Sequence, residues 1–391
     1  MEHLGRIKKL QQSLGDLGFH AAVLQYSRDI FYYTGTAQPS WFAVSPEQYT
    51  LYVRSGYETA VNEASVEKSR IKQARKLDAI YGEMFPRLHP EPRKIGLETD
   101  VLTHDQWKQY AKAFPGCEFE NISPLILEQR KRKEPGEIGL IREACRALHY
   151  GHGALVENLR EGMTELELSA CVENAHRLAG HEGIFFIRIP DFFMSRGPIS
   201  SGENLFRNTG VVYSITGVGL SPSVPAGPSL KRISRGDLIV CDIPTHVQGY
   251  HGDQSRTYCL GDAGPQARAM HKDLEAIADH LIEKIRPGIK CSEIYRLAFE
   301  KAAALGRADT FQSFGPGRRS RLIGHGIGIE LNEPPIPSEY DDSPVDENFV
   351  LALDIHMMDE KVGVVKLEDM ILVKNNGNEI LTITPRQLFE I

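Results

Sequence analysis

An internal repeat restricts the fold of this chain more than any other property of its sequence. Residues 159–180 (LREGMTELELSACVENAHRLAG) align with residues 285–306 (IRPGIKCSEIYRLAFEKAAALG) at a constant offset of 126 positions, 285 minus 159. In each copy a long helical pattern ends in Arg-x-Gly, a second helix begins a few residues later, and a glycine closes it. Chance similarity between two amphipathic helices is the alternative explanation. Two such helix pairs, each followed by β-rich sequence, predict a duplicated α+β unit with its site where the halves meet.

The N-terminal third of the chain follows a different pattern, in which helical and β-rich segments alternate. The helical patterns lie near 3–17, 58–75 and 104–114, and the β-rich segments are AAVLQYS, IFYYTG, TLYVRS and KIGLETD. We therefore predict a small α/β domain over residues 1–128. A charged link follows, with Pro135 at the start of the next helix, so the second domain is predicted to span 136–391.

Composition excludes several classes of function. The net charge of −7 arises from 45 basic and 52 acidic residues spread along the chain, without the basic patch that a nucleic-acid partner requires. No apolar run approaches the roughly 18 residues that span a bilayer, and the N-terminus reads as an amphipathic helix rather than a signal peptide. The six cysteines lie far apart with no CxxC pair. This pattern argues against disulfides and a zinc knuckle, and it favours the cytoplasm.

Two aspartates interrupt the apolar sequence that follows the first helix pair. Asp242 lies in LIVCDI and Asp253 precedes SRTYCL, and both are equidistant from a turn centred on Val247–Gln248. On a hairpin they would face each other with Cβ atoms about 4.5–5.5 Å apart. Two carboxylates that close repel each other unless a proton or a cation lies between them. A lone structural aspartate in an apolar strand is the alternative at each position.

The same arrangement recurs after the second helix pair. Asp354 interrupts FVLALDIHMM and Glu368 interrupts GVVKLEDMILV, and both are equidistant from a turn centred near Lys361. His325 stands in the loop GHGIG, where it is either a ligand held by a glycine-rich backbone or a histidine of an ordinary loop. Four carboxylates and one imidazole suit two Mn, Fe, Co or Zn ions better than a structural zinc. Two ions about 3.5–4 Å apart can bridge a water and polarise a carbonyl.

These five residues, in this order, resemble the metal ligands of the pita-bread family, which includes methionine aminopeptidase, prolidase, aminopeptidase P and creatinase. The resemblance covers the chain from about 136 to 391 and rests on the Asp-x10-Asp spacing, the GHGIG loop and the closing LED. It implies an α+β protein: a C-terminal pita-bread domain, with duplicated helix pairs and an antiparallel sheet, behind an N-terminal creatinase/prolidase-like α/β domain. A homodimer is the usual assembly of such relatives.

The resemblance also implies a role for each ligand. Asp242 would bind one divalent ion, Asp253 and Glu368 would bridge two ions, and His325 and Asp354 would hold the second. The Gly/Ser/Pro-rich segments 201–210 and 216–229 resemble loops that wall the substrate cavity of the family.

The chain departs from the family at four positions. Asp354 stands where the peptidases carry a glutamate, which is often assigned as the general base. Asn332, Val224 and Arg321 stand where relatives place histidines: seven residues after His325, about eighteen before the first aspartate, and four before His325. These positions bind substrate or handle protons in the family.

Other residues are candidates to replace the missing histidines. Asn332 can donate a hydrogen bond to an oxyanion, although it cannot carry protons near neutral pH. His356 alternates with Asp354 along a strand, so the two side chains share a face, and His356 either lines the site or packs beside it. His251 is a weaker candidate, and His246 lies in the predicted turn, where exposure is expected.

We therefore predict a metal-dependent hydrolase that resembles Xaa-Pro dipeptidases and aminopeptidases. It would cleave a peptide or small amide bond by means of a metal-bridged hydroxide, with Asp354, His356 and Asn332 as catalytic candidates and Val224, Arg321 and Asn332 as substrate-binding candidates. The alternative is a non-peptidase pita-bread enzyme acting on a small molecule, either a creatinase-like C–N hydrolase or a metal-using lyase. A binding module that kept the fold without chemistry is a third hypothesis.

Overall fold

The computed structural model describes residues 2–85, 93–192, 194–211 and 214–391. The chain forms two compact units, Met1–Arg130 and Lys131–Ile391. They divide inside the stretch from 128 to 136 in which the sequence places the link. Among the described helices, none combines the length and the apolar character needed to cross a membrane.

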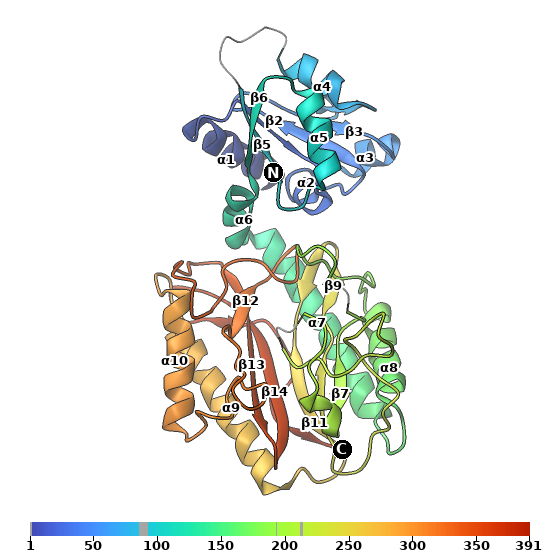
Figure 1. The fold of residues 1–391 in the computed structure, drawn as a ribbon, viewed down its shortest axis with the longest axis vertical. Coiled ribbons are helices and arrows are strands. Elements are labelled where there is room, and N and C mark those ends of the chain that lie inside the picture. The colour runs from blue at the N-terminus through green and yellow to red at the C-terminus, as the bar shows by residue number, and fades with distance from the viewer. Residues whose placement is uncertain (1, 86–92, 193, 212–213) are drawn as a thin grey trace. The chain divides into compact units, whose positions relative to one another are not determined.

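The N-terminal unit is an α/β domain with one mixed six-stranded sheet (Figure 1). The strands lie in the order β4-β3-β2-β1-β5-β6. Their bounds are Ala21–Leu24 (β1), Ser40–Val44 (β2), Tyr49–Val53 (β3), Ile71–Gln73 (β4), Arg93–Leu97 (β5) and Cys117–Asn121 (β6). The helices are Glu2–Asp16 (α1), Ser27–Thr34 (α2), Tyr57–Glu63 (α3), Leu77–Met84 (α4), His104–Ala113 (α5) and Ser123–Lys131 (α6). Side chains of α4 and α5 pack on β1, β2, β3 and β5 in a shared hydrophobic core.

Two predictions for this unit are wrong. The segment IFYYTG, expected as a strand, belongs to helix α2, which ends at Gly35 in the left-handed conformation with φ 78°. The burial of Ile30, Tyr33 and Thr34 follows helical spacing, and this packing outweighs the β-propensity of the aromatic side chains. The helix expected over 58–75 ends at Glu63, and its second half contains a short 3-10 turn and strand β4.

The C-terminal unit contains the predicted duplication. Its helices are Pro135–Asn158 (α7), Glu165–Leu178 (α8), Gly264–Lys284 (α9) and Cys291–Ala304 (α10). The offset of 126 positions relates the ends of α7 and α9 (284 minus 158), and both bounds of α8 and α10 (291 minus 165, 304 minus 178). Gly162 and Gly288, which precede the second helix of each pair, both have positive φ, 82° and 92°. The two helix pairs are therefore built to the same plan, as the sequence predicts.

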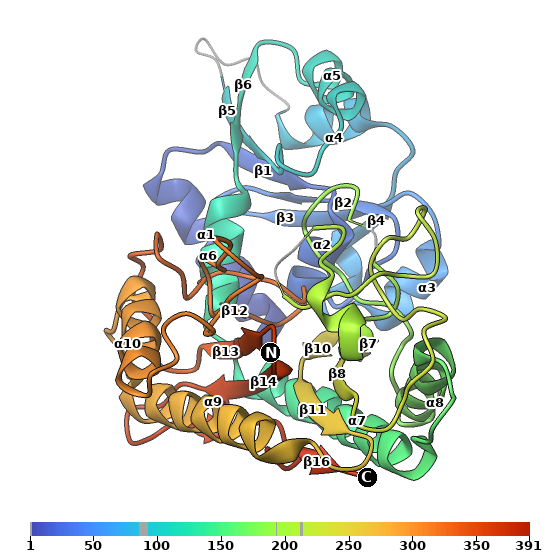
Figure 2. The same ribbon diagram turned by 60° about the horizontal axis from the view of Figure 1, so that its bottom comes forward.

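One large sheet joins the two halves. Its strands are Ile199–Ser201 (β7), Leu238–Asp242 (β8), Ser255–Cys259 (β11), Gly324–Gly326 (β12), Val350–Asp359 (β13) and Gly363–Leu372 (β14). They lie in the order β12-β13-β14-β11-β8-β7, so the halves meet where β14 pairs with β11. The short strands β15 (Glu379–Ile380) and β16 (Phe389–Glu390) pair with β14 and β11. Helix α9 packs on β13 and β14, while α7 and α8 lie beside the strands of the first half (Figure 2).

The register of the first acidic hairpin differs from the prediction. Its turn lies one residue later than expected, at Gln248 and Gly249, which both have positive φ. Strands β9 (Thr245–Val247) and β10 (Tyr250–Gly252) pair on either side of it. Asp242 therefore pairs with Ser255 across β8 and β11, and Asp253 lies between β10 and β11 rather than opposite Asp242. The two aspartates are diagonal neighbours.

The second hairpin has the predicted register. Asp354 on β13 pairs with Glu368 on β14, about a turn centred on Lys361. The expectation for His246 is wrong, because this histidine lies on strand β9 and is buried, with its Nδ1 2.8 Å from the Glu182 carboxylate.

Candidate active site

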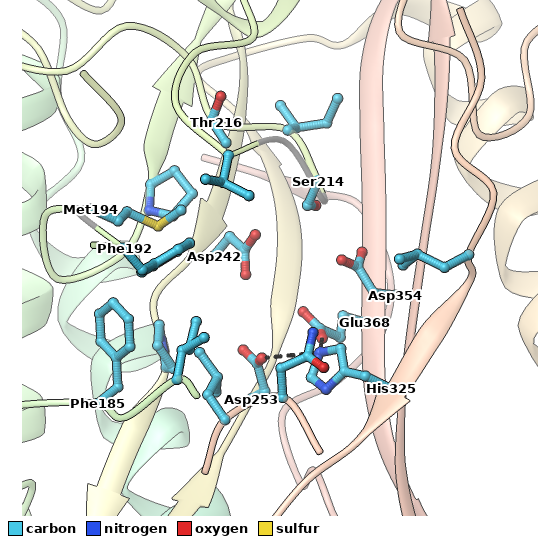
Figure 3. A pocket seen from close by; sticks show the side chains of 18 residues that line it. Phe185, Phe192, Met194, Ser214, Thr216, Asp242, Asp253, His325, Asp354 and Glu368 are labelled. Carbon is cyan, nitrogen blue, oxygen red and sulfur yellow. Dashed lines mark ion pairs between the residues drawn. The ribbon is translucent and has the colours of Figure 1, made fainter. Parts of the chain in front are cut away.

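The five predicted ligand residues line one cavity in the C-terminal unit. Asp242 ends β8, Asp253 precedes β11, and His325, Asp354 and Glu368 lie on β12, β13 and β14. All five are buried. Figure 3 shows their side chains pointing toward one another across the cavity. Residues that are up to 126 positions apart (368 minus 242) thus meet at the centre of the sheet, where the two halves join.

Glycine holds His325 in place. A Cβ added at Gly324 would lie 2.2 Å from the carbonyl oxygen of Ala352, and one at Gly326 would lie 2.5 Å from that of Pro334. Side chains at these positions would clash with the backbone, so only glycine allows β12 to lie this close to its neighbours. The His325 loop is therefore a built support for the imidazole rather than an ordinary turn.

The imidazole of His325 is oriented for metal binding. Its Nδ1 lies 3.0 Å from the carbonyl oxygen of Gly326. A carbonyl only accepts hydrogen bonds, so Nδ1 carries the proton and Nε2 keeps its lone pair. Burial lowers the pKa of His325, which keeps the ring neutral near pH 7.

Asp253, His325 and Glu368 fit a divalent ion. Their ligand atoms all lie within 4.8 Å of one another. His325 Nε2 lies 3.7 Å from Asp253 Oδ2 and 3.8 Å from Glu368 Oε1. Glu368 Oε1 is buried without a hydrogen-bond partner among the residues that the structure describes. Since buried polar atoms are normally paired, an oxygen left over beside a free imidazole nitrogen indicates a missing cation.

The electrostatics of these acids agree with a cation at this position. Burial raises the pKa of Asp253 well above its usual value, and the nearby carboxylate of Asp242 adds to the effect. Burial and the carboxylate of Asp253 likewise raise the pKa of Glu368. A bound divalent ion would stabilise both ionised carboxylates and lower these pKa values.

Lys366 also reaches into the acidic cluster, and the sequence analysis missed it. Its Nζ lies 2.5 Å from Asp242 Oδ2, 3.1 Å from Asp354 Oδ1 and 3.9 Å from Glu368 Oε2, and its side chain is fully buried. Burial alone would lower the pKa of Lys366, but the three carboxylates raise it above the usual value, so the side chain is an ammonium. The available signal was a lysine in the apolar strand GVVKLEDMILV, two residues before Glu368 and hence on the same face.

The remaining predicted site residues divide into two groups. Asn332 lines the cavity. Val224, Arg321 and His356 do not belong to the described residues that line it. The Arg321 side chain is 72% exposed and lies 4.0 Å from Glu339, on the surface of the molecule.

His356 lies behind the site rather than in it. It shares a face with Asp354, as expected, but its Nε2 lies 2.9 Å from the carbonyl oxygen of Ser313 and its ring packs against Phe314. Burial lowers the pKa of His356 to about 3. His251 is also buried, with its Nδ1 3.0 Å from the carbonyl oxygen of Gly328. Both rings are thus committed to structural hydrogen bonds.

The rest of the cavity wall is mostly apolar. Its side chains come from the segment before β7, the loop before β8 and the segments that flank β12. The residues are Phe185, Ile187, Phe192, Met194, Pro198, Val211, Ser214, Ile215, Thr216, Pro244, Leu322 and Leu331. Such walls exclude water and suit a substrate with an apolar side chain next to the reacting bond.

The duplicated α+β fold and the acid–imidazole cluster together define a metal-dependent hydrolase with the pita-bread architecture. The family model described as metallopeptidase family M24 matches residues 139–375, and a creatinase/prolidase N-terminal domain matches residues 6–132. This chain belongs to metallopeptidase family M24. Divalent metal binding and hydrolysis follow from that membership, and the non-peptidase alternative is not favoured.

Similar proteins cover almost the whole chain. An Xaa-Pro dipeptidase from Pyrococcus horikoshii is 26% identical over 386 residues, which cover 98% of both chains. The crystal structure of a prolidase from the same organism has a TM-score of 0.81 at 25% identity, covering 98% of this chain and 100% of that one. The structure of an Xaa-Pro dipeptidase from Bacillus anthracis has a TM-score of 0.83 at 21% identity and covers 100% of each chain. The last similarity concerns the fold alone.

Proposed function

We propose that this protein is a metal-dependent peptidase of the Xaa-Pro dipeptidase or aminopeptidase type, which cleaves the bond before proline in small peptides. The observation that carries the proposal is the cluster of Asp253, His325 and Glu368 at the wall of an apolar cavity. The printed names of the similar proteins, Xaa-Pro dipeptidase and prolidase, support the substrate class.

The chain's own residues would divide the work. Asp253, His325 and Glu368 would hold the ion, which when bound polarises a substrate carbonyl and lowers the pKa of water. Asp354, at the opposite side of the cavity, is placed to accept a proton from the attacking water, and Asn332 to donate an N–H to the developing oxyanion. The apolar walls would exclude bulk water and strengthen these interactions.

The number and identity of the ions belong to the proposal. The resemblance predicts two ions, and the ligand set suits Mn, Co, Fe or Zn, with manganese as our choice because most of the donors are carboxylate oxygens. The residues fit one ion at Asp253, His325 and Glu368. A second ion at Asp242 would compete with the Lys366 ammonium for the same oxygen.

A dipeptide panel tests the substrate class. The purified chain, loaded with Mn²⁺, is expected to release free proline from Leu-Pro and Met-Pro but to leave Leu-Ala and Met-Ala nearly intact. Removing the ion with EDTA should abolish the activity and Mn²⁺ should restore it, because the ion polarises the carbonyl that is attacked. Proline release is measured by chromatography. Activity that persists in EDTA, or equal cleavage of the alanine dipeptides, would contradict the proposal.

A pair of variants separates the two candidates for stabilising the transition state. Asn332→Ala is expected to lower kcat by about 10²-fold, because the oxyanion loses a hydrogen bond that forms only in the transition state. His356→Asn is expected to leave kcat nearly unchanged, because His356 donates to Ser313 outside the cavity. Steady-state kinetics on Leu-Pro measure both. A larger loss of kcat in the His356 variant than in the Asn332 variant would reverse the assignment.

We also propose a homodimer in the cytoplasm. The dimer rests on the family resemblance. Each of the six cysteines, all within the described residues, is free, which agrees with a reducing compartment. Sedimentation of the purified chain measures the assembly, and a monomer at micromolar concentration would contradict it.

A further inference from the structure

Lys366 lies where the sequence predicts a second ion. Its Nζ is 2.5 Å from Asp242 Oδ2 and 3.9 Å from Glu368 Oε2, and the resemblance assigns both of these acids to that ion. A divalent ion binds carboxylate oxygens at about 2.0–2.2 Å. Because the ammonium already donates a hydrogen bond to Asp242 Oδ2, an ion at this oxygen would lie against another cation in a buried site.

The two acids that would bridge a pair of ions each present one oxygen to His325. Asp253 Oδ1 accepts a hydrogen bond from the backbone N–H of Gln254 at 3.0 Å, while Oδ2 lies 3.7 Å from His325 Nε2. Glu368 Oε2 accepts from the Ser255 hydroxyl at 2.9 Å, while Oε1 lies 3.8 Å from His325 Nε2. Each carboxylate uses its other oxygen in a protein hydrogen bond. This arrangement serves one ion.

Lys366 is also difficult to displace. Its side chain is fully buried on β14, opposite His356 on β13. Asp354 Oδ1 lies 3.1 Å from Nζ and gives the ammonium a second carboxylate partner. Asp354 is the ligand position at which this chain carries a shorter acid than its relatives. Moving the ammonium away from both carboxylates would leave a buried charge without a partner, which is strongly unfavourable.

We propose that the Lys366 ammonium takes the place of the second ion, so that the centre binds one divalent cation through Asp253, His325 and Glu368. The inference rests on the proposed function, since it concerns the same site, and it specifies the metal content of that site. Lys366 acts as a positioning residue, because it holds Asp242 and Asp354 at the cavity without contacting the ion.

Metal analysis of three proteins tests the inference. After loading with Mn²⁺ and desalting, the wild type is expected to contain one Mn per chain and to show the electron paramagnetic resonance signal of an isolated ion. Lys366→Met removes the charge but keeps the length of the side chain, so it is expected to contain two Mn with an exchange-coupled signal. Lys374→Met, at a lysine with a 41% exposed side chain just beyond β14, is the control and should stay at one. Two Mn per wild-type chain would overturn the inference.

A second variant keeps the test informative if Lys366→Met does not fold. Asp242→Asn is expected to keep one Mn with unchanged affinity, because Asp242 does not ligate the ion in this arrangement. Loss of the ion would place it at Asp242 and overturn the inference. The proposed function is tested separately by proline release. One bound ion without cleavage of Leu-Pro would contradict the function but not the inference, and two ions with cleavage would do the reverse.

Discussion

Replacing His325 by alanine should remove the bound ion and lower kcat/KM by about 10³-fold or more. The imidazole Nε2 lies within 3.8 Å of both carboxylates with which it would share the ion. Without it, the two remaining acids offer a weaker site whose carboxylates repel each other in a buried environment. The loss of the ion removes carbonyl polarisation and water activation together.

Metal content and proline release, measured on the same preparation, check this result. His280→Ala is the matched control, since His280 lies half-buried on α9 outside the cavity and should keep both metal and activity. Circular dichroism should show that both variants are folded. A His325 variant that keeps its metal and most of its activity would refute the assignment of the ligands.

Replacing Arg256 by methionine should lower the free energy of unfolding by about 3–5 kcal/mol, the cost of breaking a buried ion pair. The Arg256 side chain is 1% exposed, and its Nη2 lies 2.7 Å from Asp369 Oδ1. Its Nη1 also donates to the carbonyl oxygen of Glu368 at 2.6 Å. Methionine fills similar volume but leaves the Asp369 charge poorly compensated and the backbone behind Glu368 without its donor.

Arg268→Met is the control for this experiment. Arg268 forms ion pairs with Asp262 and Glu390, but its side chain is 46% exposed, so its removal should cost less than about 1 kcal/mol. Urea unfolding followed by fluorescence measures both variants. Equal losses of stability would mean that burial does not set the worth of these ion pairs, and would refute the role given to Arg256.

Local patterns carried the prediction of the fold. The offset of 126 positions, read from helix-ending glycines and apolar spacing, places both helix pairs because these signals depend on neighbours three to seven residues away. The same holds for the second hairpin, whose turn about Lys361 sets Asp354 opposite Glu368. Where tertiary packing overrides local preference, the prediction is wrong, as for the aromatic segment that forms α2.

The ligand set could be read from the sequence because charged residues are rare in apolar strands, and such exceptions usually have a chemical reason. Asp242, Asp354 and Glu368 stand out in this way. Lys366 follows the same rule, yet a lone lysine in a strand does not reveal which acids it will contact. The registers of β8, β13 and β14 decide that, and a shift of one or two residues changes every cross-strand partner.

The sequence by itself therefore determined the duplicated architecture, the family resemblance and the five acid and imidazole candidates, since each depends on residue type and spacing along the chain. Only the tertiary structure decided that Asp253 is diagonal to Asp242, that Asn332 lines the cavity while Val224, Arg321 and His356 do not, and that Lys366 lies among the carboxylates. The physical reason is that these relations depend on contacts between segments up to 126 positions apart, and local spacing does not specify them.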